Sequence, residues 1–269
     1  MSAFQAIILG LVQGLTEFLP ISSSAHLTLI PWALHWPEPG LLFDTVLHVG
    51  TLAAIVAYFW HEILRILGAW FGSLRTRRID NPDARIAWLL ILGTIPAVLA
   101  GLVLEDLVEQ VLGTPAIVAA ILILTGVVLF VSDRLGRKDR SLEQLKAGDA
   151  IVIGVAQACA ILPGLSRSGA TMAGGLVRGL TRQDAARFSF LLALPITFGA
   201  AAQQIYKAAK VGLSSAEWLP MVLGALVALI AGYLAIRLLL GYVRSHSLRP
   251  FAIYCWVVGI AGLVLAWVR

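Results

Sequence analysis

Charged residues are scarce in this chain of 269 residues, where they make up 13% of the sequence and hydrophobic residues make up 59%. Soluble domains carry about 25% charged residues, so a soluble fold of this size would have too few charges to cover its surface. Together with a mean hydropathy of +0.88, this composition indicates a polytopic membrane protein. It excludes a cytosolic enzyme and a disordered chain.

Cysteine is also scarce. Cys159 and Cys255 are the only two, and both lie in apolar segments. A secreted scaffold built on disulfides is therefore excluded. The formal net charge is +5, but no basic segment is interleaved with aromatic residues as in a nucleic-acid groove. We expect no nucleic acid partner.

Six apolar runs are long enough to cross a bilayer core, which needs about 20 helical residues. They are Leu41–Trp60, Ile86–Leu104, Pro115–Val131, Phe188–Tyr206, Leu219–Ile236 and Phe251–Val268. These runs predict an all-α polytopic protein with six spanning helices, in a single membrane domain over residues 1–269.

Two further apolar regions, 2–34 and 150–177, are each broken near their middle by polar residues and proline. Each half is about 10–16 residues long, which is too short to cross a bilayer alone. Irregular backbone at membrane depth survives only where protein or a wet cavity covers it. We therefore predict two re-entrant helical hairpins.

The distribution of charge predicts an orientation. Arginine and lysine crowd the predicted loops 61–85 and 133–149, whereas 105–114 carries Glu105, Asp106 and Glu109 and no base. The positive-inside rule places the two basic stretches in the cytoplasm and the acidic one outside. Both termini then lie outside, the first hairpin opens from outside, and the second opens from inside.

The order of hairpin and three spans occurs twice. Gly10-Leu-Val-Gln13 recurs as Gly154-Val-Ala-Gln157, and we predict pseudo-repeats over residues 1–135 and 145–269. An odd number of spans in each repeat inverts the second copy, which is an architecture of secondary transporters. The alternative is that similar apolar composition imitates a repeat.

Each hairpin carries one strong charge. Apart from histidines, Glu17 is the only acidic or basic residue in 1–37, and Arg167 is the only one in 150–177. A charge at membrane depth costs about 2.5–3.5 kcal/mol on insertion scales. The two side chains therefore most simply meet each other or a shared ligand. A structural ion pair that locks the hairpins together is the alternative.

On the first hairpin, Gln13 and Glu17 are four residues apart and share one helix face. Pro20 ends that helix, and the serines at 22–24 have the character of an N-cap for the returning helix. His26 lies one turn further along. Serine with histidine can form a nucleophile and its base.

On the second hairpin, Ser166 can cap the returning helix, and Arg167 follows it at once. Further polar or small residues continue this helix, namely Ser168, Gly169 and Thr171. Helix N-termini bind anions, and the planar fork of arginine suits phosphate. Oxygens of Glu17 and Gln13 could hold Mg²⁺ or Ca²⁺. The pattern favours phosphoryl transfer or hydrolysis.

At these residues the sequence resembles the bacterial undecaprenyl-diphosphatase family, the bacitracin-resistance proteins. Gln13 and Glu17 fit a first motif of Glu or Gln, three residues, then Glu, and Pro163-Gly-Leu-Ser-Arg-Ser-Gly-Ala-Thr171 matches the second motif in full. Gln13 in place of Glu removes one anionic metal ligand.

The resemblance implies hydrolysis of undecaprenyl diphosphate to the monophosphate, recycling of this carrier for peptidoglycan synthesis, and bacitracin resistance. It places the protein in the bacterial cytoplasmic membrane, with the site open to the outer side. A homodimer is one option for its assembly. The catalytic residues so predicted are Glu17, Ser23, His26 and Arg167, with phosphate contacts from Ser22, Ser24, Ser166, Ser168, Gly169 and Thr171, and a metal held by Glu17 and Gln13.

Two points stay open in the sequence. Ser23 could attack phosphorus while His26 handles the proton, or water activated by His26 or Glu17 could attack. A polyprenyl-phosphate flippase or a secondary transporter is the rival function, because inverted repeats are typical of alternating access. Asp44 and His48 are one turn apart, and we expect an interfacial role for them, with assistance to a metal or to the substrate as the alternative.

Overall fold

The computed structural model describes residues 1–104, 111, 114–211 and 218–269. Helices dominate this part of the chain, and its only β pairing is an isolated bridge between Arg140 and Leu180. The predicted all-α class is confirmed. The acidic residues used for the orientation, Glu105, Asp106 and Glu109, lie outside the described residues.

Six of the helices are long and apolar enough to cross a membrane. They are α3 (Leu41–Thr76), α4 (Pro82–Val103), α6 (Pro115–Leu135), α9 (Arg182–Val211), α10 (Trp218–Tyr242) and α11 (Arg249–Val268). Each predicted run lies on one of these helices, and the helices extend past the runs by up to six residues at an end, or by sixteen at the end of α3. The protein is therefore a multi-pass membrane protein.

The stretch 61–85, treated above as a loop, is mostly helical. α3 continues to Thr76, beyond an irregular residue at Phe59 (φ −100°, ψ 17°), and ends at Arg77 in the left-handed conformation. Ile66 is buried in this extension, so the basic segment still packs one apolar face. The loop prediction was wrong because the residues between two apolar runs were taken to be irregular, although the arginines among them are good helix formers.

The two broken regions form helical hairpins. The first consists of α1 (Ala3–Phe18) and α2 (Ser23–Ala33), and the second of α7 (Ala147–Cys159) and α8 (Arg167–Val177). At a rise of about 1.5 Å per residue, none of these four helices reaches across a core of about 30 Å. The structure is consistent with re-entrant hairpins.

The hairpins pack against the opposite halves of the chain. α1 lies along α10, and α7 lies along α4. A Cβ at Gly10 would lie 2.4 Å from the carbonyl oxygen of Gly224, and a Cβ at Gly154 would lie 2.4 Å from that of Gly93. These two reciprocal contacts are consistent with the predicted inverted repeats, which stay a prediction.

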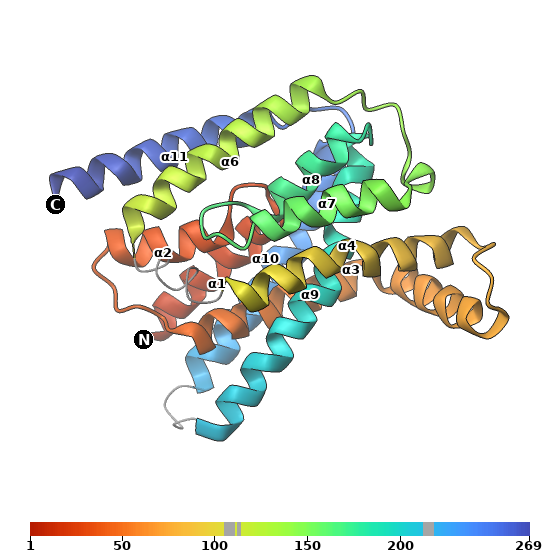
Figure 1. Ribbon diagram of the computed structural model, residues 1–269. Helices are drawn as coiled ribbons and strands as arrows, with labels where there is room; N and C mark the ends of the chain where they lie inside the picture. The colour runs from red at the N-terminus through yellow and green to blue at the C-terminus, as the bar shows by residue number, and fades with distance from the viewer. Residues whose placement is uncertain (105–110, 112–113, 212–217) are drawn as a thin grey trace.

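Figure 1 places both chain termini at one end of the molecule, and the turn between α3 and α4 at the other. The segment after α6, which contains the 3₁₀ helix η1 (Leu142–Gln144), lies at the same end as that turn. The two basic stretches therefore share one end, as the charge pattern predicts.

Ion pairs fasten this basic end. The buried Asp149 accepts hydrogen bonds from Arg140 Nη2 at 2.7 Å and from Arg178 Nε at 2.6 Å. Burial alone would raise the pKa of the Asp149 carboxyl, but these guanidinium groups outweigh it and lower the pKa to about 2. The segment after α6 is thereby tied to α7 and to the end of α8.

Candidate active site

The start of α2 is shaped by a serine N-cap. The hydroxyl of Ser22 accepts a hydrogen bond from the Ala25 amide at 3.4 Å and lies 3.1 Å from the Ser24 hydroxyl. Ser22 has φ 70° and ψ 99°, so the chain reverses sharply after Pro20. The predicted N-cap among residues 22–24 is confirmed, at Ser22.

The start of α8 repeats this arrangement. The hydroxyl of Ser166 accepts a hydrogen bond from the Gly169 amide at 3.1 Å and lies 3.1 Å from the Ser168 hydroxyl. Gly164, just before it, has φ 97°, a conformation that glycine adopts without the steric cost of a Cβ. The predicted cap at Ser166 is confirmed.

The two turns touch each other. The amide of Gly164 donates to the Ser24 hydroxyl at 3.3 Å, and the Ser168 hydroxyl donates to the Leu19 carbonyl at 3.3 Å. Two helix N-termini, each with amide groups that have no partner in their own helix, therefore meet at one place. Such ends favour an anion.

Glu17 is the centre of the polar contacts. Its Oε1 accepts from Arg167 Nη2 at 2.5 Å, and its Oε2 accepts from Gln13 Nε2 at 3.0 Å and from the Ser23 hydroxyl at 2.7 Å. His48 Nε2 lies 3.6 Å from Oε2. The lone acid of one hairpin thus contacts the lone base of the other, as the sequence predicts.

Polar atoms around this contact are buried without a partner among the described residues. They include Arg167 Nη1, Gln13 Oε1 and Asp44 Oδ1. A buried unpaired donor costs about 1–3 kcal/mol, and more when it is charged. Arg167 therefore has one side of its fork on Glu17 and the other available to a ligand oxygen.

His26 lies beside the cap rather than against the Ser23 hydroxyl. Its Nδ1 is 2.8 Å from the Ser22 carbonyl oxygen, and its Nε2 is 2.8 Å from the hydroxyl of Tyr254. The recorded acceptor of the Ser23 hydroxyl is Glu17. The structure therefore pairs Ser23 with a carboxylate, and a Ser23–His26 pair stays a prediction.

Thr171 is fully buried one turn behind Arg167. Its hydroxyl contacts the carbonyl oxygens of Arg167 at 2.8 Å and Ser168 at 3.2 Å, and the Ser189 hydroxyl at 2.6 Å. In this arrangement it supports the first turn of α8. Its contact with phosphate stays a prediction.

Three contributors were missed in the sequence or given a lesser role. Thr125 on α6 donates to the Gly164 carbonyl at 2.8 Å and accepts from the Ser166 amide at 3.1 Å; a threonine within a long apolar run was a usable signal. Tyr254 gave no such signal, because aromatic residues are common in spans. His48, for which we expected an interfacial role, lies near Glu17.

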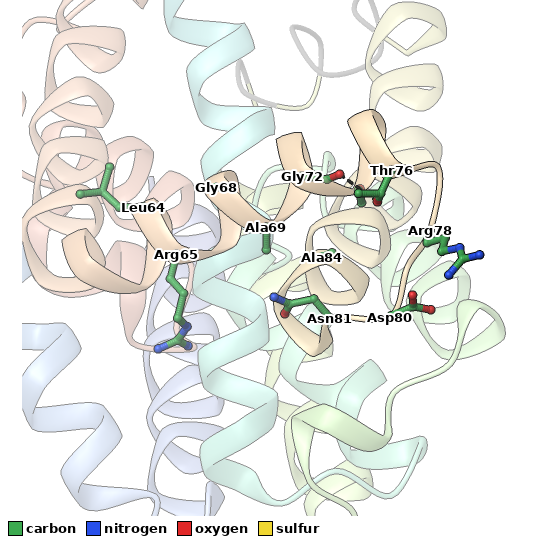
Figure 2. A pocket seen from close by; sticks show the side chains of 11 residues that line it. Leu64, Arg65, Gly68, Ala69, Gly72, Thr76, Arg78, Asp80, Asn81 and Ala84 are labelled. Atoms are coloured by element: carbon green, nitrogen blue, oxygen red, sulfur yellow. Dashed lines mark hydrogen bonds between the residues drawn. The ribbon is translucent and has the colours of Figure 1, made fainter.

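Two surface hollows lie away from this group. One has a volume of about 470 Å³ and lies between the second half of α3 and the start of α4; Figure 2 shows Arg65, Arg78 and Asn81 among its lining residues. Another, of about 600 Å³, is lined by Arg140 and other residues around Asp149. Neither is lined by a residue that contacts Glu17, so neither is the candidate site.

Comparison with known proteins agrees with the geometry. Residues 6–261 match the family described as Bacitracin resistance protein BacA. An undecaprenyl-diphosphatase of Desulforudis audaxviator is 46% identical over 269 residues, which cover 100% of both chains. One of Moorella thermoacetica is 44% identical with the same coverage, and one of Thermomicrobium roseum is 43% identical over 98% of both chains.

These full-length matches confirm the resemblance drawn from the two motifs. The motifs are the segments that form the two hairpin turns and carry Glu17 and Arg167. The chain belongs to the Bacitracin resistance protein BacA family.

Proposed function

We propose that this protein hydrolyses undecaprenyl diphosphate to undecaprenyl phosphate and inorganic phosphate, the activity for which its relatives are named. The observation that carries the proposal is the contact between Glu17 and Arg167. It joins a carboxylate and a guanidinium from two hairpins, at the meeting point of two helix N-termini. The resulting lipid monophosphate would serve again as carrier in peptidoglycan synthesis, and its recycling underlies bacitracin resistance.

In this proposal Arg167 and the starts of α2 and α8 bind the diphosphate. Nη2 of Arg167 holds Glu17, while the buried Nη1 has no partner among the described residues and can donate to a phosphate oxygen. The helix N-termini add amide donors and positive dipole ends. Hydroxyl contacts to the phosphates come from the serines that line the two turns, Ser22, Ser24, Ser166 and Ser168, with Gly169 allowing close approach.

Ser23 is the nucleophile that the contacts favour. Its hydroxyl donates to Glu17 at 2.7 Å, so the carboxylate can accept the proton while Oγ attacks the terminal phosphorus. The bond from this phosphorus to the bridging oxygen breaks, and undecaprenyl phosphate leaves. Water then hydrolyses the phosphoserine, releases inorganic phosphate and restores Ser23. Direct attack by water, activated by Glu17 or His26, is the competing route.

The two routes can be distinguished because only attack by Ser23 forms a phosphoserine intermediate that can be trapped. Protein mixed with substrate carrying labelled terminal phosphate is denatured within one turnover, and label bound to the chain is counted. Attack by Ser23 predicts labelled wild-type protein and unlabelled Ser23→Ala protein without turnover. Attack by water predicts no label in either protein, with measurable turnover in the variant.

We also propose a divalent cation, Mg²⁺ or Ca²⁺, held mainly by the substrate. The described residues contain no group of three His, Cys, Asp or Glu side chains that could hold a metal ion. Glu17 already accepts three hydrogen bonds, whereas Gln13 Oε1 is buried without a partner in the described part of the chain. Phosphate oxygens would supply most ligands and Gln13 Oε1 one more, because Mg²⁺ uses few protein ligands beside phosphates.

When bound, the ion would neutralise charge on the diphosphate. Phosphate release after chelation, with Mg²⁺ or Ca²⁺ then added back, tests this. We expect activity to return with the ion and Gln13→Ala to require a higher ion concentration. Full activity in the chelator would contradict the proposal.

We propose that the protein lies in the bacterial cytoplasmic membrane with the basic end in the cytoplasm. The site would then open to the outer side. The grouping of the stretches 61–85 and 133–149 at one end supports this placement. Labelling of single cysteines in intact cells tests it, and the predicted homodimer is tested by the mass of the purified protein in detergent.

The central test of function is phosphate release from undecaprenyl diphosphate by purified protein in detergent, where no membrane gradient exists. We expect wild-type protein to release phosphate and Glu17→Ala to lose that activity. Glu38→Ala is the matched control, because Glu38 is exposed between α2 and α3. A flippase or transporter would release no phosphate in this assay.

A further inference from the structure

The two ring nitrogens of His26 have different partners. The Ser22 carbonyl oxygen, 2.8 Å from Nδ1, can only accept, so Nδ1 carries the hydrogen. In the neutral ring Nε2 is then an acceptor, and the Tyr254 hydroxyl donates to it at 2.8 Å. The two rings are also stacked, with centroids 5.6 Å apart and planes 14° from parallel.

His26 is bonded to a strained residue. Ser22 has φ 70° and ψ 99°, a region that residues with a Cβ rarely occupy. Such a conformation persists only where the surroundings hold it. The hydrogen bond from His26 Nδ1 to the Ser22 carbonyl is one of the interactions that stabilise this conformation. The next residue, Ser23, begins α2 and donates to Glu17.

Tyr254 comes from α11, 228 residues further along the chain. The same helix contacts the first hairpin through Cys255, whose thiol lies 3.8 Å from the Pro20 carbonyl oxygen. α11 therefore contacts the turn between α1 and α2 at both its chain reversal and its histidine.

We propose that Tyr254 is a positioning residue of the diphosphatase site, which holds His26 against the Ser22 carbonyl and thereby fixes the turn that presents Ser23 to Glu17. The inference rests on the proposed function. It adds a residue outside both sequence motifs and assigns it a task that acts through His26 rather than on the substrate.

Tyr254→Phe removes the hydroxyl and keeps the ring, so it tests the contribution of the hydroxyl alone. Tyr254 is 41% exposed, and phenylalanine can retain the stacking of the ring on His26, so the packing of α11 is kept. Tyr233→Phe is the matched control: Tyr233 is 38% exposed on α10, and its ring packs edge-on against Tyr58 with centroids 5.5 Å apart. The control removes a tyrosine hydroxyl from a residue of similar exposure whose ring contacts Tyr58 rather than His26.

The experiment measures kcat and KM for phosphate release from undecaprenyl diphosphate in detergent. We expect Tyr254→Phe to lower kcat about fivefold, which corresponds to one neutral hydrogen bond of about 1 kcal/mol. KM should stay within about twofold, because Arg167 and the helix starts are unchanged. Tyr233→Phe should match wild type. An unchanged kcat, or a rise in KM alone, would overturn the inference.

A second variant separates action through His26 from an independent effect. In a His26→Ala background, Tyr254→Phe should cause no further loss, since the acceptor of its hydroxyl is gone. Losses that multiply in the double variant would show that Tyr254 acts independently and would overturn the inference. Wild-type protein that releases no phosphate would instead overturn the proposed function, so the two failures are distinguishable.

Discussion

Arg167→Lys separates the charge of the guanidinium from its shape. In the structure Arg167 donates to Glu17 through Nη2 at 2.5 Å, while Nη1 is buried and has no partner among the described residues. A guanidinium can donate to Glu17 and to a phosphate oxygen at the same time because its donors are spread over a planar fork. The ammonium of lysine is compact, so it cannot occupy both of the positions from which the fork donates to Glu17 and to a phosphate oxygen.

The expected loss follows from one missing contact. A hydrogen bond to a charged group contributes about 1.5–3 kcal/mol, and each 1.36 kcal/mol is a factor of about ten in rate. Arg167→Lys should therefore lower kcat/KM for undecaprenyl diphosphate by about 10- to 150-fold. The net charge of the site stays the same, so long-range attraction of the substrate is unchanged.

The assay is phosphate release by purified protein in detergent over a range of substrate concentrations. Arg65→Lys is the control, because Arg65 is exposed and its single recorded ion pair is with Asp83, at 2.7 Å. We expect this control to match wild type. A kcat/KM for Arg167→Lys within twofold of wild type would refute direct binding of phosphate by the fork.

Three further predictions concern the scaffold, each checked by thermal unfolding in detergent. Thr125→Val should destabilise the protein by about 1–3 kcal/mol, because it leaves the Ser166 amide and a carbonyl unpaired. Gly154→Ala should also destabilise it, since the new Cβ would lie 2.4 Å from a backbone oxygen of α4, whereas Gly148→Ala, with open space around it, should not. Because the pKa of Asp149 is lowered to about 2, its stabilising contribution should be complete above about pH 4 and lost as the pH falls through 2, and Asp149→Asn should remove this dependence.

The fold follows from the sequence wherever the signal is local. Apolar runs of about 20 residues predict spans, and breaks at Pro20 and Pro163 predict the hairpins. The extension of α3 to Thr76 did not follow, because helix formation outside the bilayer depends on packing of one face, such as Ile66, which a count of charges does not measure.

The candidate site divides in the same way. The meeting of Glu17 and Arg167 could be predicted, because each is the lone strong charge of its hairpin at membrane depth. The partner of the Ser23 hydroxyl could not, since spacing on a helix places His26 near it without fixing where the ring points. Tyr254 reaches His26 only through the tertiary fold, and an aromatic residue in a span predicts nothing specific.

The central claim is that Arg167 on one hairpin and Glu17 on the other act on the same bound diphosphate. The most direct measurement is the equilibrium binding of undecaprenyl diphosphate in detergent to Glu17→Gln, which should not turn it over, and to the double variant Glu17→Gln/Arg167→Ala. The account predicts binding by the single variant and at least a tenfold weaker affinity in the double variant. Equal affinities in the two proteins would contradict it.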